Sequence, residues 1–346
     1  MTADGQNTKS KIQKISNRAR LSAAIIGTLL FAGLFFFLAR AWFDSQDTTG
    51  TAEVADPNKR AEGATAFRGA SYESSGVVYV PGSNGILFVD DSRPGEVFWT
   101  QLDRAGKQVG EVEAIYTDTL VEDPESITFD GSYFYILGSQ SEPKAGKNNA
   151  LIRFRFDASS RKISNVEKIE DLRDFLLQNI PELKGSGEKS GTEGGLNVEG
   201  IAWDPTNRIF MLGLRSPMMD DQALLFPIRF KEPNAPVSIS NLEPAATQAI
   251  KLRLGDLGVL DIQYDSRLKS FLIIAGAPKD REKGNFSLWQ WDGRPGEAGL
   301  RKISALDPRL KPEGVTRVEI GGTDYVFLVF DSSSYAKLDY STLTGS

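Results

Sequence analysis

Four acidic residues open related segments of the chain and could share one site. Glu125, Glu199 and Glu313 begin the segments ESIT, EGIA and EGVT, and Asp261 stands one residue later in the related segment LDIQ. If the fold brings these carboxylates together, they cannot all stay ionised unless a cation offsets their charge. Ligation by oxygen atoms alone suits Ca²⁺ or Mg²⁺. These residues therefore predict a divalent-cation site, with Ca²⁺ as the cofactor.

A structural role is the alternative for the same carboxylates. A Glu at the start of a strand can accept hydrogen bonds from backbone N–H groups of the neighbouring unit and so fasten the fold. Recurrence at equivalent positions is expected under both interpretations, and the sequence leaves the choice open.

The chain has 346 residues and contains neither cysteine nor histidine. These absences exclude disulfides, thiolate nucleophiles, Ser-His-Asp triads and imidazole or thiolate ligation of zinc, iron or copper. Acid–base chemistry would fall to carboxylates, Lys, Tyr or a metal-bound water. Any site chemistry is therefore predicted to be based on oxygen.

A second set of polar side chains follows the more apolar strand of these units, and we predict that it binds a ligand: Asp91, Gln140, Arg215 and Asp331. Arg215 stands among acidic residues and could clamp a carboxylate or phosphate. The alternative for Arg215 is an ion pair between units, with Asp91 or Asp331.

The segments that position these residues recur along the chain. Units begin at residues 75, 125, 199, 260 and 313, and each pairs a short strand with a more apolar second strand across a turn. Two further strand-like runs lie between most of these pairs, and four strands per unit of about 50 residues is typical of a β-propeller blade. We predict an all-β fold with five blades, six being possible; a two-sheet sandwich is the simpler alternative. Residues 64–70 are expected to supply the last strand of the final blade and close the ring.

A helical insertion is predicted at residues 171–195. Apolar residues of its first part fall on one helical face, Asp171 is a suitable N-cap, and Pro181 ends the pattern. We expect a surface helix that covers a blade edge; a lid or docking element is the alternative. Trp203, Trp289 and Trp291 lie at strand positions and are expected to pack in the core.

The N-terminal region predicts a membrane anchor. Residues 21–39 are uncharged and could span roughly 28 Å as a helix, with a basic cytoplasmic segment at residues 1–20. Residues 40–63 are expected to be a flexible tether, and residues 64–346 the propeller. The predicted protein is a single-pass bacterial inner-membrane protein with its propeller in the periplasm or extracytoplasmic space. A cleaved signal peptide is the alternative.

Charge is unevenly distributed. The net charge is −6, residues 1–42 carry six basic residues and one acidic residue, and the remainder is therefore −11. An acidic body argues against nucleic acid as a partner. The predicted partners are the membrane, through residues 21–39, and a small anion or protein ligand.

Several segments resemble a bacterial propeller family known as domain of unknown function 3616, and more distantly phytase-like and esterase-like propellers. They are residues 123–141, 196–217, 260–280 and 311–316. The resemblance implies a propeller fold and no established reaction. Where a GSHS-like segment is expected in that family, this chain has Gly138-Ser139-Gln140-Ser141, which leaves hydrogen bonding without proton transfer at Gln140.

These observations favour a ligand- or partner-binding propeller with a divalent cation in its channel. One alternative is a Ca²⁺-dependent hydrolase of phosphate or carboxylic esters, in which Ca²⁺ activates water and Arg215 steadies the anion. A second alternative is a glycosidase that uses two channel carboxylates.

Overall fold

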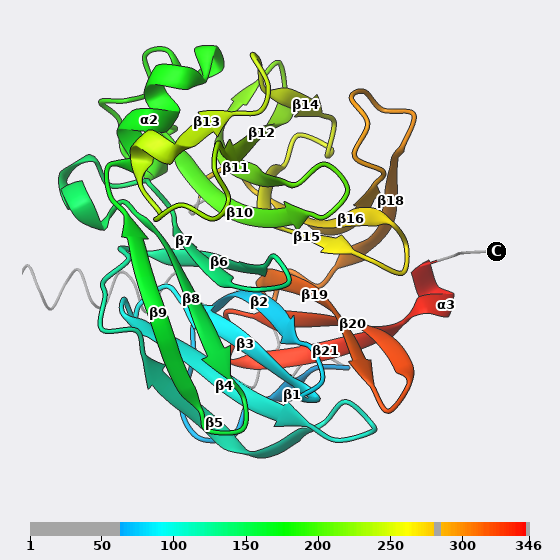
Figure 1. The fold of residues 1–346 in the computed structure, drawn as a ribbon. Coiled ribbons are helices and arrows are strands. Elements are labelled where there is room, and N and C mark those ends of the chain that lie inside the picture. The colour runs from blue at the N-terminus through cyan, green and yellow to red at the C-terminus, as the bar shows by residue number, and fades with distance from the viewer. Residues whose placement is uncertain (1–62, 280–284, 344–346) are drawn as a thin grey trace, which may run out of the picture. The chain divides into compact units, whose positions relative to one another are not determined.

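Short antiparallel strands joined by tight turns make up most of the computed structural model, which describes residues 63–279 and 285–343 (Figure 1). The hairpin after Asp204 shows how the sequence sets these turns. The Asp204 carboxylate accepts hydrogen bonds from the backbone N–H groups of Thr206 and Asn207, at 2.8 and 3.2 Å. Arg208 then takes a left-handed conformation with φ of 56°, and the chain reverses into the next strand.

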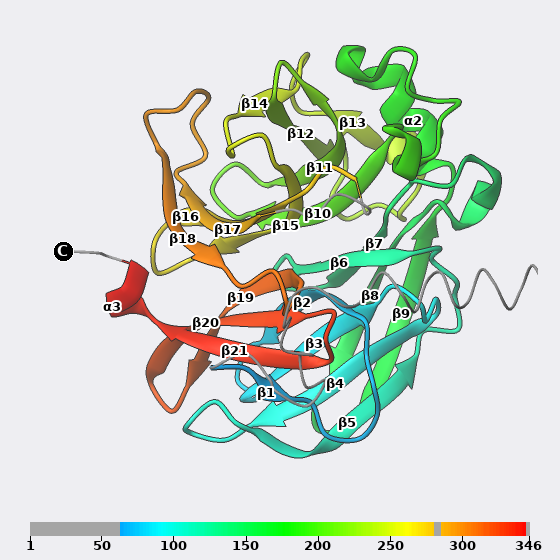
Figure 2. The ribbon, with the colours of Figure 1, turned by 180° about the vertical axis from the view of Figure 1, so that it is seen from behind.

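The strands form five antiparallel sheets, which confirms the predicted all-β, five-bladed propeller (Figures 1 and 2). From the axis outward, the first two blades contain β2 (Ser74–Val80), β3 (Gly85–Asp90), β4 (Glu96–Leu102) and β5 (Gln108–Tyr116), then β6 (Pro124–Phe129), β7 (Phe134–Gly138), β8 (Leu151–Asp157) and β9 (Lys162–Ile169). The third contains β10 (Asn197–Asp204), β11 (Ile209–Met219), β12 (Gln222–Phe230) and β13 (Leu242–Pro244), with β14 (Ile250–Leu252) also paired to β12. The last two contain β15 (Gly258–Asp265), β16 (Ser270–Gly276), β17 (Phe286–Trp291) and β18 (Leu300–Leu306), then β19 (Pro312–Ile320), β20 (Thr323–Phe330), β21 (Ser334–Asp339) and β1 (Thr65–Ala66).

The innermost strands β2, β6, β10, β15 and β19 each contact the next around the central axis. Apolar side chains between adjacent sheets form the core in several clusters, one of which joins Phe88 of β3 to Phe327 of β20. The core is therefore distributed between the blades.

The ring is closed by pairing between the two ends of the propeller, as predicted. Thr65 and Ala66 of β1 pair with Tyr335 and Ser334 of β21. Phe67 then packs between blades, with its ring 4.9 Å from that of Phe88 and 5.0 Å from that of Tyr335. Strand pairing and aromatic packing thus replace the disulfide that this chain cannot form.

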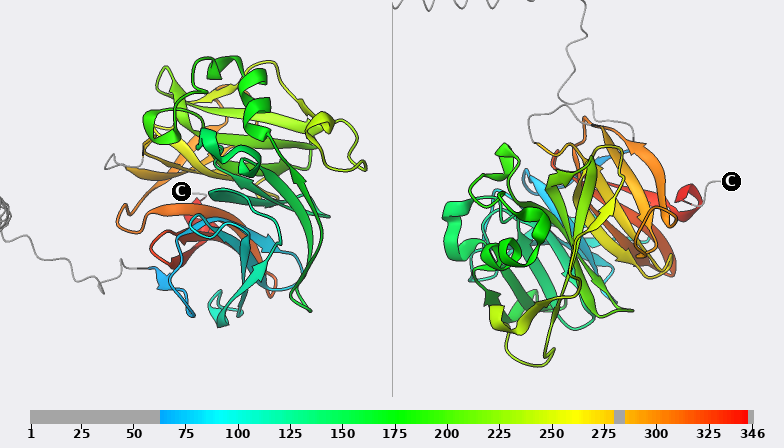
Figure 3. Two further views of the ribbon diagram at one scale, coloured as in Figure 1. Left: turned by 90° about the vertical axis from the view of Figure 1, so that its left-hand side faces the viewer. Right: turned by 90° about the horizontal axis from the view of Figure 1, so that it is seen from above.

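The insertion between blades 2 and 3 contains α2 (Leu172–Asn179), followed by short 3₁₀ turns at Pro181–Leu183 and Gly191–Glu193 (Figure 3). Leu172 and Leu176 are buried in the cluster that blades 2 and 3 share. Asp171 occupies the N-cap position, but its side chain makes no capping hydrogen bond. Further short helical segments are Pro143–Asn148, Ile239–Asn241 and α3 (Tyr340–Leu343).

Within residues 63–279 and 285–343, no helix is both long enough and apolar enough to cross a membrane. The predicted span at residues 21–39 lies outside the described residues.

Phe67→Ala should lower the free energy of unfolding of the full-length protein by about 3–5 kcal/mol, because it removes a buried ring between two blades. Leu120→Ala is the control, since Leu120 is 52% exposed and its loss should change stability by less than about 0.5 kcal/mol. Urea unfolding followed by fluorescence measures both. Equal stability of the two variants would show that Phe67 contributes nothing to ring closure.

Candidate functional site

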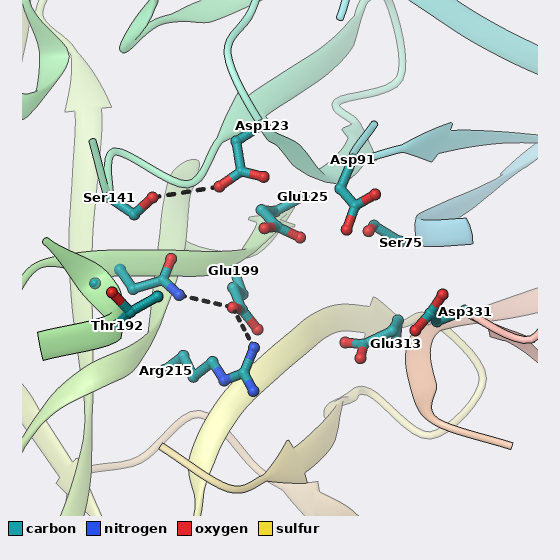
Figure 4. Close-up of a pocket in the computed structure, with 12 residues that line it drawn as sticks. Ser75, Asp91, Asp123, Glu125, Ser141, Thr192, Glu199, Arg215, Glu313 and Asp331 are labelled. Atoms are coloured by element: carbon teal, nitrogen blue, oxygen red, sulfur yellow. Dashed lines mark hydrogen bonds and ion pairs between the residues drawn. The ribbon is translucent and has the colours of Figure 1, made fainter. Parts of the chain in front are cut away.

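A cavity of about 210 Å³ opens at the mouth of the channel where the innermost strands begin (Figure 4). Glu125, Glu199 and Glu313 all line it, so the structure brings together three of the four predicted metal ligands. The predicted ligand-binding residues Asp91, Arg215 and Asp331 line it as well. The remaining lining residues were not singled out from the sequence: Ser75, Asp123, Ser141, Gly191, Thr192 and Asn197.

A β-bulge presents each Glu to the cavity. The register between the first and second strands shifts between Pro124 and Ser126, between Val198 and Gly200, and between Pro312 and Gly314. The residue skipped in each blade is Glu125, Glu199 or Glu313. A bulge leaves its extra residue out of the ladder and re-aims its side chain, which places the three carboxylates at the mouth.

The same register excludes Asp261 from the cavity. In blade 4 the shift falls between Val259 and Asp261, so Leu260 takes the bulged position and Asp261 is paired in the ladder. Asp261 is fully buried, and its carboxylate accepts hydrogen bonds from the Ser126 hydroxyl at 2.8 Å and from the Val315 backbone N–H at 2.9 Å. These contacts fit the structural role considered for the carboxylates, because through them Asp261 joins blades 2, 4 and 5 within the channel.

Gln140 also lies away from the cavity. Its side chain is buried, and Nε2 donates hydrogen bonds to the carbonyl oxygens of Gly138 at 2.7 Å and Ala150 at 3.3 Å. Its backbone φ of 59° turns the side chain back onto its own loop. Gln140 is thus placed to shape the loop that carries Ser141.

Arg215 pairs with Glu199, and the expected partners Asp91 and Asp331 were wrong. Its Nη1 donates to Glu199 Oε1 at 2.9 Å, and its Nε donates to the Ala277 carbonyl of the next blade at 2.9 Å. Both residues belong to blade 3. The bulge at Glu199 brings its carboxylate toward the end of the neighbouring strand, where Arg215 lies. Asp331 instead forms an ion pair with Lys311.

Asn197 adds a neutral oxygen to the cavity wall. It is 8% exposed, and its Nδ2 donates to Glu199 Oε1 at 2.8 Å. Its Oδ1 is buried and has no hydrogen-bond partner among the described residues. A buried amide oxygen without a donor is costly, and a cation or ligand in the cavity would satisfy it. The only sequence signal for Asn197 is its place two residues before the EGIA segment.

Three carboxylates at the cavity have no hydrogen-bond or ion-pair partner among the described residues: Asp91, Glu125 and Glu313. Burial raises the pKa of Asp91 to about 7, with contributions from Asp123 and other nearby carboxylates. Burial and the charge of Glu199 hold the pKa values of Glu125 and Glu313 well above the usual range. The cavity therefore gathers carboxyl groups whose ionised form is disfavoured by burial and by their neighbours, although Arg215 partly offsets this for Glu313.

The carboxylates of the cavity are spread around it, as Figure 4 shows. Among the described residues, one acidic group has oxygen atoms that all lie within 4.8 Å of one another, and it is formed by Glu73, Asp90 and Asp91. Asp90 in that group already accepts hydrogen bonds from Ser92 and is paired with Arg93. Glu125, Glu199 and Glu313 are not part of that group.

The insertion covers a blade edge and also forms part of the cavity wall, through Gly191 and Thr192. The Gly191 backbone N–H donates to the Ser141 carbonyl at 3.2 Å, and a Cβ at Gly191 would lie 2.9 Å from that of Ser141. The buried Arg173 side chain of α2 donates to the carbonyl oxygens of Gln140 and Gly187. The predicted surface helix is therefore only part of the insertion, since Gly191 and Thr192 of the following loop line the cavity. The sequence pattern does not show where that loop packs.

Asp261→Asn should lower the free energy of unfolding by about 1–3 kcal/mol, because an amide cannot accept both hydrogen bonds that the carboxylate accepts. Chemical denaturation of the full-length protein measures the loss. Ser266→Ala on the following turn is an exposed control. If Asp261→Asn is as stable as the control, the contacts across the channel do not stabilise the ring.

The free energy of unfolding should fall as pH rises from about 4 to about 7 in the presence of a chelator. In that range the unfolded chain releases protons at its ordinary carboxyl pKa values, whereas the folded protein keeps them on groups whose pKa is raised. Glu125→Gln with Glu313→Gln should flatten the decline, because an amide does not titrate. Denaturation midpoints across pH measure this, and an equally steep decline in the double variant would contradict the assignment.

Comparisons with known proteins give only distant similarities. No curated protein matches the chain. A carbohydrate-active enzyme of family AA12 from Trichoderma reesei is 11% identical with a TM-score of 0.45, covering 81% of this chain and 96% of that one. A glucose dehydrogenase is 13% identical with a TM-score of 0.43, covering 80% of this chain and 98% of that one. A putative 6-phosphogluconolactonase from Bacteroides fragilis is 13% identical with a TM-score of 0.33, covering 74% of this chain and 60% of that one.

At these identities and TM-scores, nothing about this chain is concluded from these structures. A family model described as "Protein of unknown function (DUF3616)" matches residues 140–339. The matched residues include Glu199, Arg215, Glu313 and Asp331 of the cavity, while Asp91 and Glu125 precede them. Because the match spans more than half of the chain, the protein belongs to this family.

Proposed function

We propose that the propeller binds Ca²⁺ in the acidic cavity and uses the ion to hold an anionic small-molecule ligand. The observation that carries this proposal is that Asp91, Glu125 and Glu313 line one cavity with no hydrogen-bond or ion-pair partner among the described residues. Like charges that share one partly enclosed cavity destabilise the folded protein unless they are protonated or a cation is present. A divalent cation removes the repulsion without protonation.

Donor chemistry supports Ca²⁺ over softer metals. The chain offers neither thiolate nor imidazole, and the cavity presents carboxylates, the Asn197 amide oxygen and the Ser75 hydroxyl. Ca²⁺ accepts six to eight oxygen ligands in flexible geometry and tolerates waters among them. Mg²⁺ is smaller and demands near-ideal octahedral geometry, which carboxylates spread around the cavity supply less readily.

Arg215 supports an anion as the ligand. Its guanidinium lines the same cavity as the proposed ion. A carboxylate or phosphate that replaces water on Ca²⁺ could also receive a hydrogen bond from a guanidinium beside it. Glu199 and the Ala277 carbonyl fix the orientation of Arg215, so the side chain is arranged before the ligand arrives. Binding is therefore favoured over the hydrolase and glycosidase alternatives, for which no contact supplies a specific argument.

We also propose that the protein is anchored through residues 21–39, with the propeller on the extracytoplasmic side. The uncharged run and the basic flank at residues 1–20 support this proposal. An extracellular or periplasmic Ca²⁺ supply would suit a site of moderate affinity.

Ca²⁺ should raise the melting temperature of the full-length protein after chelator treatment. At a free concentration about 100 times the dissociation constant, the gain should be about 2.7 kcal/mol. Glu125→Gln with Glu313→Gln should abolish most of this gain and should also stabilise the cation-free protein at neutral pH, since repulsion is relieved. Differential scanning calorimetry and metal analysis measure both effects.

Glu297→Gln is the matched control, because Glu297 is exposed and pairs with Arg253 on the outside of blade 4. It should leave the Ca²⁺ response unchanged. A wild-type protein that melts identically with Ca²⁺ and with chelator would refute the cation site. A full response in the double variant would place the ion elsewhere.

A further inference from the structure

Aromatic side chains occupy four of five equivalent positions near the opposite ends of the innermost strands, and an arginine occupies the fifth. Four residues after each bulged position stand Tyr79, Phe129, Trp203, Tyr264 and Arg317, one from each blade. All five are partly exposed, and all five line a second cavity of about 290 Å³. Because strands β2, β6, β10, β15 and β19 all contribute, this cavity lies at the channel mouth remote from the acidic one.

Buried rings support these aromatic side chains from below. Phe129 lies opposite Phe134 in the ladder, with ring centroids 4.4 Å apart. Trp203 lies opposite Phe210 in the next blade, at 4.8 Å. The expectation that Trp203 is a core residue was therefore incomplete, because its ring also lines the surface cavity.

Trp203 and Asp130 also line a neighbouring cavity of about 450 Å³ between blades 2 and 3. Its lining includes the cations Arg153, Arg208, Arg229 and Lys231. Glu167 pairs with Arg153 and Glu243 pairs with Arg229.

The other two cations remain available to a ligand. The Arg208 side chain is exposed and has no hydrogen-bond or ion-pair partner among the described residues. Lys231 Nζ donates to the Ser240 carbonyl at 2.8 Å and has no carboxylate partner in the described part of the chain. Two unneutralised cations beside an aromatic platform are unusual in a body of net charge −11.

We propose that these two adjoining cavities bind an acidic oligosaccharide, with a sugar ring on Trp203 and sugar carboxylates paired with Arg208 and Lys231. A pyranose ring has an apolar face of C–H groups that can cover an aromatic ring, and a rim of hydroxyls that suits polar lining groups such as Thr128 and Ser266. Guanidinium groups bind carboxylates in a planar, bidentate manner. Two cavities that share Trp203 call for a ligand of more than one ring.

A single-stranded nucleic acid would also use aromatic and basic groups. The acidic body disfavours it, because phosphate binding requires an extended basic surface. The proposed saccharide site is independent of the proposed Ca²⁺ site, since it is built from the other ends of the same strands. A chelator therefore allows it to be tested alone.

The test is a calorimetric titration of the full-length protein with hyaluronan hexasaccharide in the presence of EDTA. We expect a dissociation constant below about 1 mM that weakens at higher salt. Arg208→Gln combined with Lys231→Gln should weaken binding about tenfold or more. Trp203→Leu should also weaken it, with thermal unfolding used to verify that the variant is folded.

Lys269→Gln is the matched control. Lys269 occupies the place of Arg208 in the hairpin of the next blade, with φ of 51° against 56°, and does not line either cavity. Unchanged affinity in this variant, together with the losses above, supports the proposal. Three results would overturn it: no binding of the hexasaccharide, equal affinity of the double variant and wild type, or tighter binding of a single-stranded thymidine hexanucleotide.

Discussion

Close approach of five strands around one axis is the constraint on which the rest of this propeller depends. In blades 2, 3 and 5 the ladder position that follows the bulge holds Ser126, Gly200 and Gly314. In blade 1, Gly76 lies within the register shift between Ser74 and Val77. A Cβ at Gly76 would lie 2.4 Å from the Ser126 Cα, and one at Gly314 would lie 2.5 Å from the Ser75 carbonyl oxygen. Side chains larger than these would push the blades apart. In blade 4 the equivalent residue is Asp261, whose carboxylate accepts hydrogen bonds from Ser126 of blade 2 and Val315 of blade 5.

This packing explains why charge collects at one mouth. The positions closest to the axis accept only small residues. A larger polar side chain is accommodated at the bulge immediately before the small residue, where it is unpaired and points toward the mouth. The same bulge holds Glu125, Glu199 and Glu313 in their respective blades, so the three side chains converge. The folded protein thus holds carboxylates in a place where burial raises the pKa of Glu125 and Glu313. Stability and cation binding become linked, because a bound cation favours only the folded arrangement.

The repeat was predictable from sequence because each unit carries the same opening and the same apolar second strand. The convergence of the three Glu residues followed from that repeat. Asp261 was misplaced because one residue of displacement around a bulge moves a side chain from the mouth into the channel. Asn197, Asp123 and the Gly191 loop were missed because their positions depend on how loops pack in three dimensions. No local pattern encodes that packing.

The same geometry places a carboxylate and an aromatic ring at opposite ends of one innermost strand. An innermost strand such as β10 (Asn197–Asp204) presents Glu199 at its beginning and Trp203 near its end. Between them the channel is filled by hydrogen-bonded side chains, including Gln263, whose Nε2 donates to the Ile127 carbonyl at 2.7 Å. The two mouths therefore differ in character: carboxylates line one, and aromatic rings together with Arg317 line the other, where Trp203 also borders the cavity that holds Arg208 and Lys231.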